Sequence, residues 1–326
     1  MNMAKRKYSK SKKIQPAVLR MKFTLPAVNP LNPTQAGVGY VDLSQCASLV
    51  NRRFYRQGLN WAVAGITLVD DSGAGSGIVT VQKLPSTWVT SNGWEKTFRA
   101  WMKMNENAME ETPSMRPKYL DYKIHFDNYH AEDSAFAYNL LPIDFVGSVA
   151  EWSASTVKIP NSAATGAGAV GAVDSYFLHM CGPNGPSATS GSSKGIIEGY
   201  QDSRALPFSP DPNVLADTSS NWISSIFNEG TSQDNAVMNA LEDDYDEVPY
   251  DLERYPGGSI FQTNGEFVDT VDFTTTTVSG RNRIKPFNAP CGLIRLNNRS
   301  DADLTMYIDL VPGHHRGYLA EPMTDM

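Results

Sequence analysis

Residues 304–310, LTMYIDL, alternate strictly between apolar and polar side chains. Residues 119–127, YLDYKIHFD, repeat the pattern, with apolar residues at positions 120, 122, 124 and 126. A period of two residues is typical of β-strands that bury one face. Seven further strand-like runs, separated by turn residues, complete an all-β prediction: 18–25, 38–43, 60–69, 77–84, 174–181, 267–278 and 291–297.

The composition supports strands joined by long uncharged loops. Only 19% of the 326 residues are charged, and the chain contains 25 Gly and 20 Pro. Such a composition argues against a helical bundle, and nine strands with very uneven connections favour a sandwich over a regular propeller. A chain of this length can bury a sizeable core without disulfides or metal.

Helices are predicted at only a few places. In residues 92–109, Trp94, Phe98, Trp101 and Met102 follow helical spacing, and Asn92 precedes Glu95 by three residues, as in a capping box. Two shorter helical patterns, around 222–227 and 237–241, lie in a long insertion at about 200–260.

Charge is distributed very unevenly along the chain. The net charge is -7, yet residues 1–22 hold eight Lys and Arg and no acid, because the first acid is Asp42. The remaining 20 basic and 35 acidic residues give the rest of the chain a net charge of -15. A basic terminus on an acidic body indicates contact with nucleic acid or a membrane surface.

Residues 1–13 hold almost no apolar side chains, so we predict a disordered arm. Its cations would bind phosphate without reading sequence, and Tyr8 could stack on an unpaired base. A solubilising tail is the alternative interpretation, and a nuclear import signal in such a stretch is compatible with nucleic-acid contact. The predicted nucleic-acid-binding residues are Lys5, Arg6, Lys7, Tyr8, Lys10, Lys12, Lys13, Arg20 and Lys22.

No group of residues predicts catalysis, a cofactor or a metal. Residues 166–171, GAGAVG, lack the strand and helix of a dinucleotide site, and residues 191–195, GSSKG, are predicted to be a loop rather than a nucleophile elbow. The three cysteines are far apart, and no HExxH or CxxC pattern occurs. The acidic stretch 242–253 is predicted to be a solvated loop, with a divalent ion at a subunit contact as the alternative. No apolar run is long enough to span a membrane.

The segment LPSTWVTSNGWEKTFRAWMKMN, residues 84–105, resembles capsid proteins of circular Rep-encoding single-stranded DNA viruses. The basic start MNMAKRKYSKSKK and the β-rich body are similar in layout to those coats. The resemblance implies a single jelly roll of two four-stranded antiparallel sheets, in an icosahedral shell of about 60 copies with the arm inside. The arm departs from many relatives because it is rich in lysine and has only two arginines.

We therefore expect a basic arm over residues 1–22 and a jelly-roll shell domain over 23–326. The expected function is a structural capsid protein, not an enzyme, that packages a single-stranded DNA genome. Its expected partners are further copies of itself, the genome, host nuclear import factors and a host receptor. The expected locations are the virion and the host nucleus or cytoplasm. The alternatives are a non-viral nucleic-acid-binding β protein with a basic tail, and a lectin-like sandwich.

Overall fold

The computed structural model describes twelve stretches of the chain, from residue 16 to the C-terminus. The chain consists of two compact units, residues 1–200 with 262–326, and residues 201–261. The predicted insertion at 200–260 lies outside the described residues from 204 on, as do its two predicted helices. The described residues are 16–27, 37–71, 76–106, 110, 112–115, 121–132, 136–143, 152–160, 173–185, 193–203, 264–274 and 280–326.

The first sheet is built around β12 (Leu304–Leu310), the strand with the strictest alternation in the sequence. β1 (Arg20–Leu25) pairs with one edge of β12 and β3 (Leu59–Val69) with the other, both antiparallel. On the far edge of β3, β9 (Arg281–Ile284) and β10 (Phe287–Ala289) pair with residues 66–69 and 61–63. β15 (Ala320–Pro322) pairs with residues 59–61 on the edge of β3 that β12 occupies further along. We call this sheet A.

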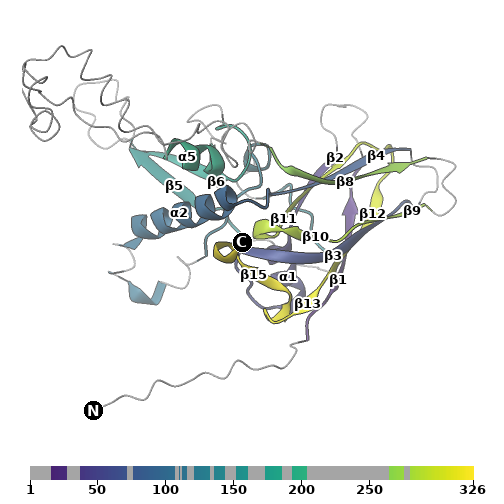
Figure 1. Ribbon diagram of the computed structural model, residues 1–326, viewed down its shortest axis with the longest axis horizontal. Coiled ribbons are helices and arrows are strands. Elements are labelled where there is room, and N and C mark those ends of the chain that lie inside the picture. Colours follow the sequence, from purple (N-terminus) through teal and green to yellow (C-terminus); the bar gives the residue numbers. More distant parts are fainter. Residues whose placement is uncertain are drawn as a thin grey trace, which may run out of the picture. The chain divides into compact units, whose positions relative to one another are not determined.

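Four antiparallel strands form the second sheet, sheet B (Figure 1). In spatial order these are β2 (Gly37–Asp42), β11 (Leu293–Asn298), β4 (Gly77–Lys83) and β8 (Glu266–Phe273). The inward side chains of both sheets form one apolar core, as the alternating patterns predict. Trp61 and Phe23 are among its largest fully buried side chains.

The strand order is that of a jelly roll. If β9 and β10 are counted as two pieces of one strand, the eight strands run in the order 1-8-3-6 in sheet A and 2-7-4-5 in sheet B. The first strand pairs with the last, the second with the seventh, the third with the sixth and the fourth with the fifth. Such a rolled-up antiparallel hairpin is the jelly-roll topology, so the predicted fold class is confirmed.

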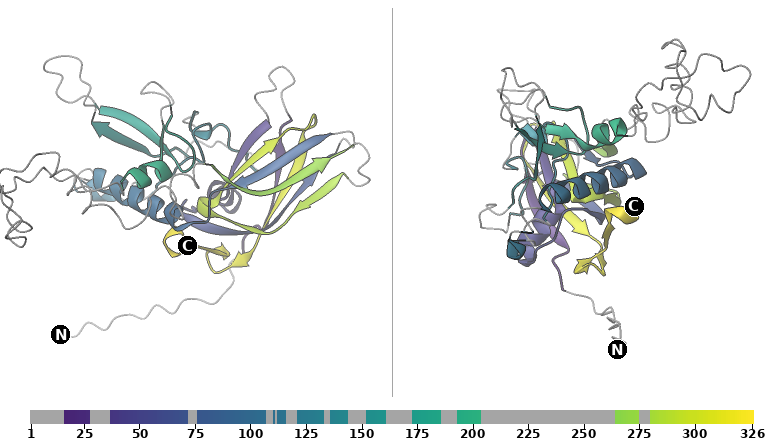
Figure 2. Two further views of the ribbon diagram at one scale, coloured as in Figure 1. Left: turned by 45° about the horizontal axis from the view of Figure 1, so that its top comes forward. Right: turned by 90° about the vertical axis from the view of Figure 1, so that its left-hand side faces the viewer.

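The connection from β4 to β8 contains most of the other elements. Within it α2 (Trp88–Met104) is the longest helix of the described residues, and β5 (Thr156–Pro160), β6 (Val173–His179) and β7 (Ser193–Gly195) form a separate sheet (Figure 2). The run predicted at 174–181 therefore belongs to this small sheet and not to the sandwich. No described helix has the length and apolarity needed to cross a membrane. The remaining elements are α1 (Leu43–Asn51), η1 (Pro113–Met115), η2 (His130–Glu132), α5 (Ile196–Asp202), η4 (Pro290–Gly292), β13 (Pro312–Gly313), β14 (Gly317–Tyr318) and η5 (Met323–Asp325).

The strand predicted at 119–127 is wrong. Among its described residues, 121–127, only His125 makes a bridge, an isolated one to His179. Side chains satisfy part of its backbone: Gln57 bonds both the N–H and the carbonyl of Ile124, and the N–H of Lys123 donates to Ser155. The N–H and the carbonyl of His125 bond the backbone of Leu178 and Met180. The segment keeps its apolar alternation because it packs into a second core without joining a sheet.

The second core covers part of the outer face of sheet B. Tyr40 and Leu293 project from sheet B into it, and α2, residues 121–127, β6 and α5 supply most of the other side chains. Gly58 permits close packing there, because it adopts a φ of 98° and an added Cβ would lie 2.2 Å from the Trp94 ring. The two cores therefore share sheet B as a common wall.

The predicted helix exists but begins earlier than expected. α2 starts at Trp88 after an N-cap at Thr87, so Asn92 and Glu95 lie inside the helix and the predicted capping box is wrong. The helix has an additional turn at its N-terminus because Val89 is fully buried in the second core, and this burial outweighs the capping preference of Asn92. Trp94 and Trp101 are both buried, as the helical spacing predicts.

Candidate nucleic-acid interface

Two of the nine residues predicted to bind nucleic acid lie in the described part of the chain. Arg20 is the first residue of β1, and Lys22 is the third. The other seven lie outside the described residues, so their role stays a prediction: Lys5, Arg6, Lys7, Tyr8, Lys10, Lys12 and Lys13.

The residues just before β1 are held against the body. The N–H of Val18 donates to Oδ1 of Asn51 at 3.0 Å, and its carbonyl accepts from the Tyr318 hydroxyl at 2.7 Å. The carbonyl of Leu19 accepts from the N–H of Leu310 at 2.8 Å. The predicted boundary at residue 22 therefore falls inside the sheet, and the body begins no later than Val18.

β1 turns its basic residues outward. Met21 and Phe23 are buried in the core between the sheets, so the strand's alternation places Arg20 and Lys22 on the outer face of sheet A. The cations of the predicted arm and these two residues follow one another along the chain, but they differ in how they are held. The pair in β1 occupies fixed positions on a sheet.

Further cations join them across the sheet. Lys22 is in register with Tyr307 of β12, Tyr307 with Thr67 of β3, and Thr67 with Arg283 of β9. Arg281 lies two residues before Arg283 and projects from the same side of β9. We call this surface the basic face: Arg20, Lys22, Arg281, Arg283 and Tyr307.

One acid lies among these cations. Arg20 donates from Nε and Nη2 to the two carboxylate oxygens of Asp309, at 2.6 and 2.8 Å. Hydrogen bonding from Arg20, with the charges of Arg283 and Arg281, lowers the pKa of Asp309, which therefore stays ionised. The basic face thus gathers four cations around this carboxylate, on a body whose net charge is strongly negative. The surface can attract phosphate by Coulomb forces.

Tyr307 gives the basic face an aromatic ring between two cations. The Arg20 guanidinium carbon and the Lys22 ammonium nitrogen lie 5.8 and 6.0 Å from the ring centre. Aromatic rings flanked by cations are typical of grooves that bind single strands, because a base can stack where the cations hold the backbone. Arg281 and Arg283 were not among the residues predicted from the sequence, although their spacing in RNRIK, 281–285, matches the two-residue strand period.

A buried polar cluster lies where residues 125–130 pack against sheet B. Oδ1 of Asp127 accepts from the Tyr40 hydroxyl at 2.7 Å and from the His130 N–H at 2.8 Å, and Arg295 lies 3.3 Å from Oδ2. Nδ1 of His130 accepts from the Phe126 N–H, so Nε2 carries the ring proton and donates it to Oδ1 of Asn139. These bonds hold His130 in its neutral form.

Two further histidines complete this cluster. His125 is fully buried, its ring stacks 4.3 Å from Phe136, and neither ring nitrogen has a hydrogen-bond partner in the described residues. His179 is also fully buried, and its Nε2 lies 3.1 Å from the carbonyl of Pro183. Within the described stretches, no group of three or more His, Cys, Asp or Glu could hold a metal ion.

Acid is expected to destabilise the protein through these histidines. Burial lowers the pKa of His130 to about 3, and it also lowers the pKa values of His125 and His179. Below pH 6.5 the unfolded chain therefore binds protons that the folded chain does not, and the free energy of unfolding falls as the pH falls. His130 alone accounts for about 2 kcal/mol at pH 5.

One buried carboxyl opposes this loss. Burial raises the pKa of Asp42 to about 6, so the folded chain binds this proton at a higher pH than the unfolded chain does. This adds about 1 kcal/mol to the free energy of unfolding at pH 5. Urea unfolding at pH 7.5 and pH 5 measures the balance. His125→Leu should make the pH dependence shallower, because it removes one of the histidines whose pKa burial lowers. Equal stability of the parent at both pH values would contradict the argument.

The sequence GSSKG is not the loop that was predicted. Ser193–Gly195 form β7 and lead directly into α5, so its last three residues have a strand-to-helix setting. Ser193 is nevertheless buried, and its Oγ has no hydrogen-bond partner in the described part of the chain. A serine nucleophile needs a base within hydrogen-bond reach, and this side chain does not have one there.

The cysteines and two of the sequence motifs do not form a site in the described residues. Cys46, Cys181 and Cys291 are buried free thiols. The stretches GAGAVG and 242–253 lie outside the described residues.

Comparisons with protein-family models, curated proteins and solved structures found no match, so the residues and the fold carry the functional argument.

Proposed function

We propose that this chain is a viral capsid protein that assembles into a closed shell around a single-stranded DNA genome. The jelly-roll strand order is the observation that carries the proposal, because this architecture builds many viral capsids. Jelly rolls also build lectins and cupins, so the fold needs a second line of support.

That support comes from the charge distribution. Eight cations precede Phe23, two of them sit on the basic face, and Arg281 and Arg283 extend that face across sheet A. Such a surface neutralises phosphate without sequence recognition, as packaging a whole genome requires. A lectin or a cupin has no need of this arrangement.

The same charges indicate how the shell closes. The chain carries a net charge of -7, so copies packed side by side repel each other. Contacts between subunits must therefore be dominated by apolar and aromatic residues, of which Tyr, Phe and Trp supply 14, 13 and 6. Raised salt would screen the repulsion and leave these contacts intact.

Assembly of the full chain tests the proposal. Purified protein treated with nuclease should sediment as closed particles in moderate salt and stay assembled when the salt is raised. Negative-stain images should show uniform round shells. A monomer or dimer under every condition would contradict the capsid function. DNA binding by such a small species would favour the non-viral nucleic-acid-binding protein, and glycan binding without the arm would favour the lectin-like sandwich.

A further inference from the structure

A second basic surface lies where the arm joins the body. After α1 ends, residues 51–56 read NRRFYR, and the hairpin of β13 and β14 contains HHR at 314–316. Arg52, Arg53, Arg56 and Arg316 are all exposed. We call this surface the root patch: Arg52, Arg53, Phe54, Arg56 and Arg316.

Hydrogen bonds connect the two loops of the root patch to each other and to the arm. Nη1 of Arg316 donates to the carbonyl of Phe54, and the Tyr55 hydroxyl donates to the carbonyl of Arg316 at 3.0 Å. Nη1 of Arg53 donates to the carbonyl of Pro16 at 3.4 Å. The patch therefore lies beside the first described residues of the chain, which follow the stretch 1–13 that is predicted to be disordered.

The local backbone fixes the loop that carries three of these arginines. Arg52 ends α1 in the left-handed region, with a φ of 51°, and its N–H donates to the carbonyl of Ser48. Tyr55 is buried, and its N–H donates to the Ser48 hydroxyl at 2.8 Å. A loop held in this way presents its side chains without a large ordering cost on binding.

Acidic residues are missing from the arm and from both loops of the root patch. No Asp or Glu occurs before Asp42, from residue 43 to residue 69, or from residue 310 to residue 320. The segment 121–123 reaches Phe54 through Lys123, 5.7 Å from the ring centre, and its acid, Asp121, is ion-paired with that lysine. The chain as a whole has more acids than bases, so this segregation is specific to the surface at the arm's origin. Charge complementarity therefore points to a polyanion.

Phe54 narrows the class of polyanion. Its side chain is 46% exposed although it lies among arginines, and one side of it is supported by Trp152, with ring centres 6.2 Å apart. An exposed ring backed by a second aromatic is a stacking platform, and only an unpaired base offers a free face to it. A duplex or an inorganic polyanion would use the arginines alone.

We propose that the root patch binds single-stranded polynucleotide, with phosphates on its arginines and a base stacked on Phe54. This inference rests on the proposed packaging function and adds a second fixed contact, at the point where the arm leaves the body. DNA and RNA share the chemistry that the patch recognises, so oligo-dT and oligo-U of equal length are compared in the test.

The test measures oligonucleotide affinity of the full chain against salt concentration. Phe54→Leu keeps the packing on Trp152 and removes the stacking ring. It should weaken oligo-dT binding about five- to tenfold without changing the salt slope, and leave an abasic oligonucleotide unaffected. Arg52→Asn, Arg53→Gln and Arg56→Gln together should reduce the salt slope by about 2, because each lost phosphate contact on a single strand contributes about 0.7.

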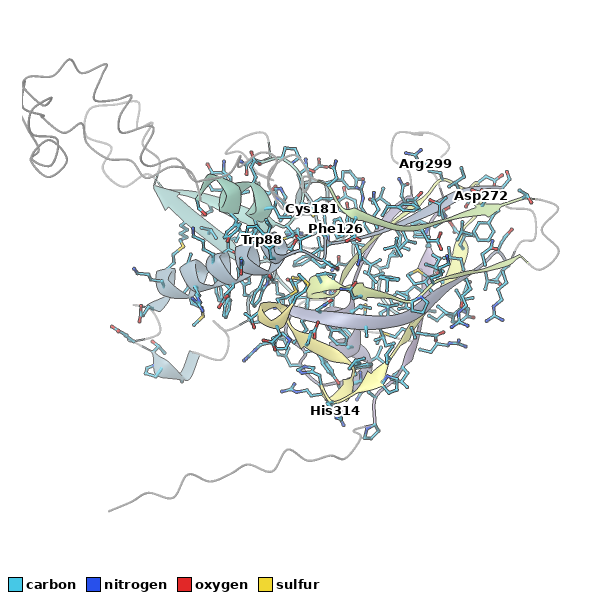
Figure 3. The ribbon with its side chains drawn as sticks, viewed as in Figure 1. Trp88, Phe126, Cys181, Asp272, Arg299 and His314 are labelled. Carbon is cyan, nitrogen blue, oxygen red and sulfur yellow. The ribbon has the colours of Figure 1, made fainter. Side chains whose placement is uncertain are left out.

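A matched variant controls for charge. Arg99→Gln, Lys103→Gln and Arg299→Gln also remove three exposed cations, and Figure 3 shows Arg299 at the opposite end of the sandwich from His314. If this control loses as much affinity as the patch variant, or if Phe54→Leu binds oligo-dT like the parent or weakens abasic binding equally, the proposal is overturned. Intact particles with these results would leave the capsid function standing. Weaker binding of one of the two oligonucleotides by the parent would identify the preferred polynucleotide.

Discussion

Removing residues 1–15 is expected to lower the affinity for single-stranded DNA about a thousandfold at about 0.15 M salt. The segment carries six cations and no acid. Each phosphate neutralised on a single strand contributes about 0.7 to the salt slope, so six contacts give a slope of about -4 and roughly three orders of magnitude in affinity. The six cations are Lys5, Arg6, Lys7, Lys10, Lys12 and Lys13.

The structure sets where this deletion must stop. A cut at residue 22 would remove half of β1 and the ion pair between Arg20 and Asp309, so any loss of binding would be confounded with damage to sheet A. A cut after residue 15 keeps the hydrogen bonds of Val18 and Leu19. Affinity for an oligo-dT, measured by fluorescence anisotropy over a range of salt, gives both the constant and the slope.

A full-length variant with the six cations replaced by Gln is the matched control. It should bind as weakly as the deletion, because the effect comes from charge and not from chain length. Residual, salt-dependent binding is expected in both proteins from the basic face and the root patch. Parental affinity in the deleted protein, or a parental affinity that does not change with salt, would contradict the packaging role of the arm.

Most of the sandwich could be predicted from alternation alone. Seven of its strands match predicted runs because each buries one face, as β12 does with Met306 and Ile308 inward. β9 and β10 were missed because each is short and their joint role as one strand depends on pairing with β3. Helix α1 was also missed, although Asp42 followed by Gln45 three residues later is a capping signal, and Asp42 does cap the helix.

The failed strand at 119–127 shows what alternation cannot decide. Tyr122, Ile124 and Phe126 are buried as the pattern requires, but a buried alternating segment needs only some partner for its backbone. Here Gln57 and Ser155 provide part of it through their side chains, and both are distant in the sequence. A single sequence does not reveal such long-range side-chain partners.

The basic surfaces could be predicted only where charges are consecutive. The arm is visible as a run of cations, whereas the basic face joins β1 to β9 across some 260 residues of sequence, a separation that only strand register closes. The root patch likewise joins residues 51–56 to Arg316. The runs NRRFYR and RNRIK can be seen in the sequence, but nothing local shows that the first meets Arg316 or that the second lies on one face with β1.

Replacing Trp101 with Ala is expected to lower the free energy of unfolding by about 3–5 kcal/mol, the range for truncating a buried Trp or Phe. Trp101 is 7% exposed and its ring lies 5.5 Å from that of Tyr122. Tyr122 also contacts Trp94 and Phe98, so one tyrosine is packed among three rings of α2. Figure 2 shows this helix running along one side of the first unit.

The loss of unfolding free energy should be well above that at an exposed site, because the side chains around the cavity left by Trp101 cannot move in to fill it. Tyr122 is held in place by a hydrogen bond from its hydroxyl to Thr97, 3.1 Å long, and by its other ring contacts. Met104→Ala, on the same helix but 45% exposed, is the matched control and should change stability by about 0.5 kcal/mol or less. A parental melting temperature for Trp101→Ala would show that the ring is not packed as described.

Denaturant unfolding of Trp101→Ala also tests whether the two cores unfold together. Tyr40 and Leu293 belong to sheet B yet point into the second core, so loosening that core exposes the outer face of the same sheet whose inner face closes the jelly roll. Because the wall is shared, the variant should unfold in one transition with a lower midpoint and an unchanged m-value. A separate early transition would mean that α2 and its partners unfold on their own, and the shell domain would then consist of the sandwich alone.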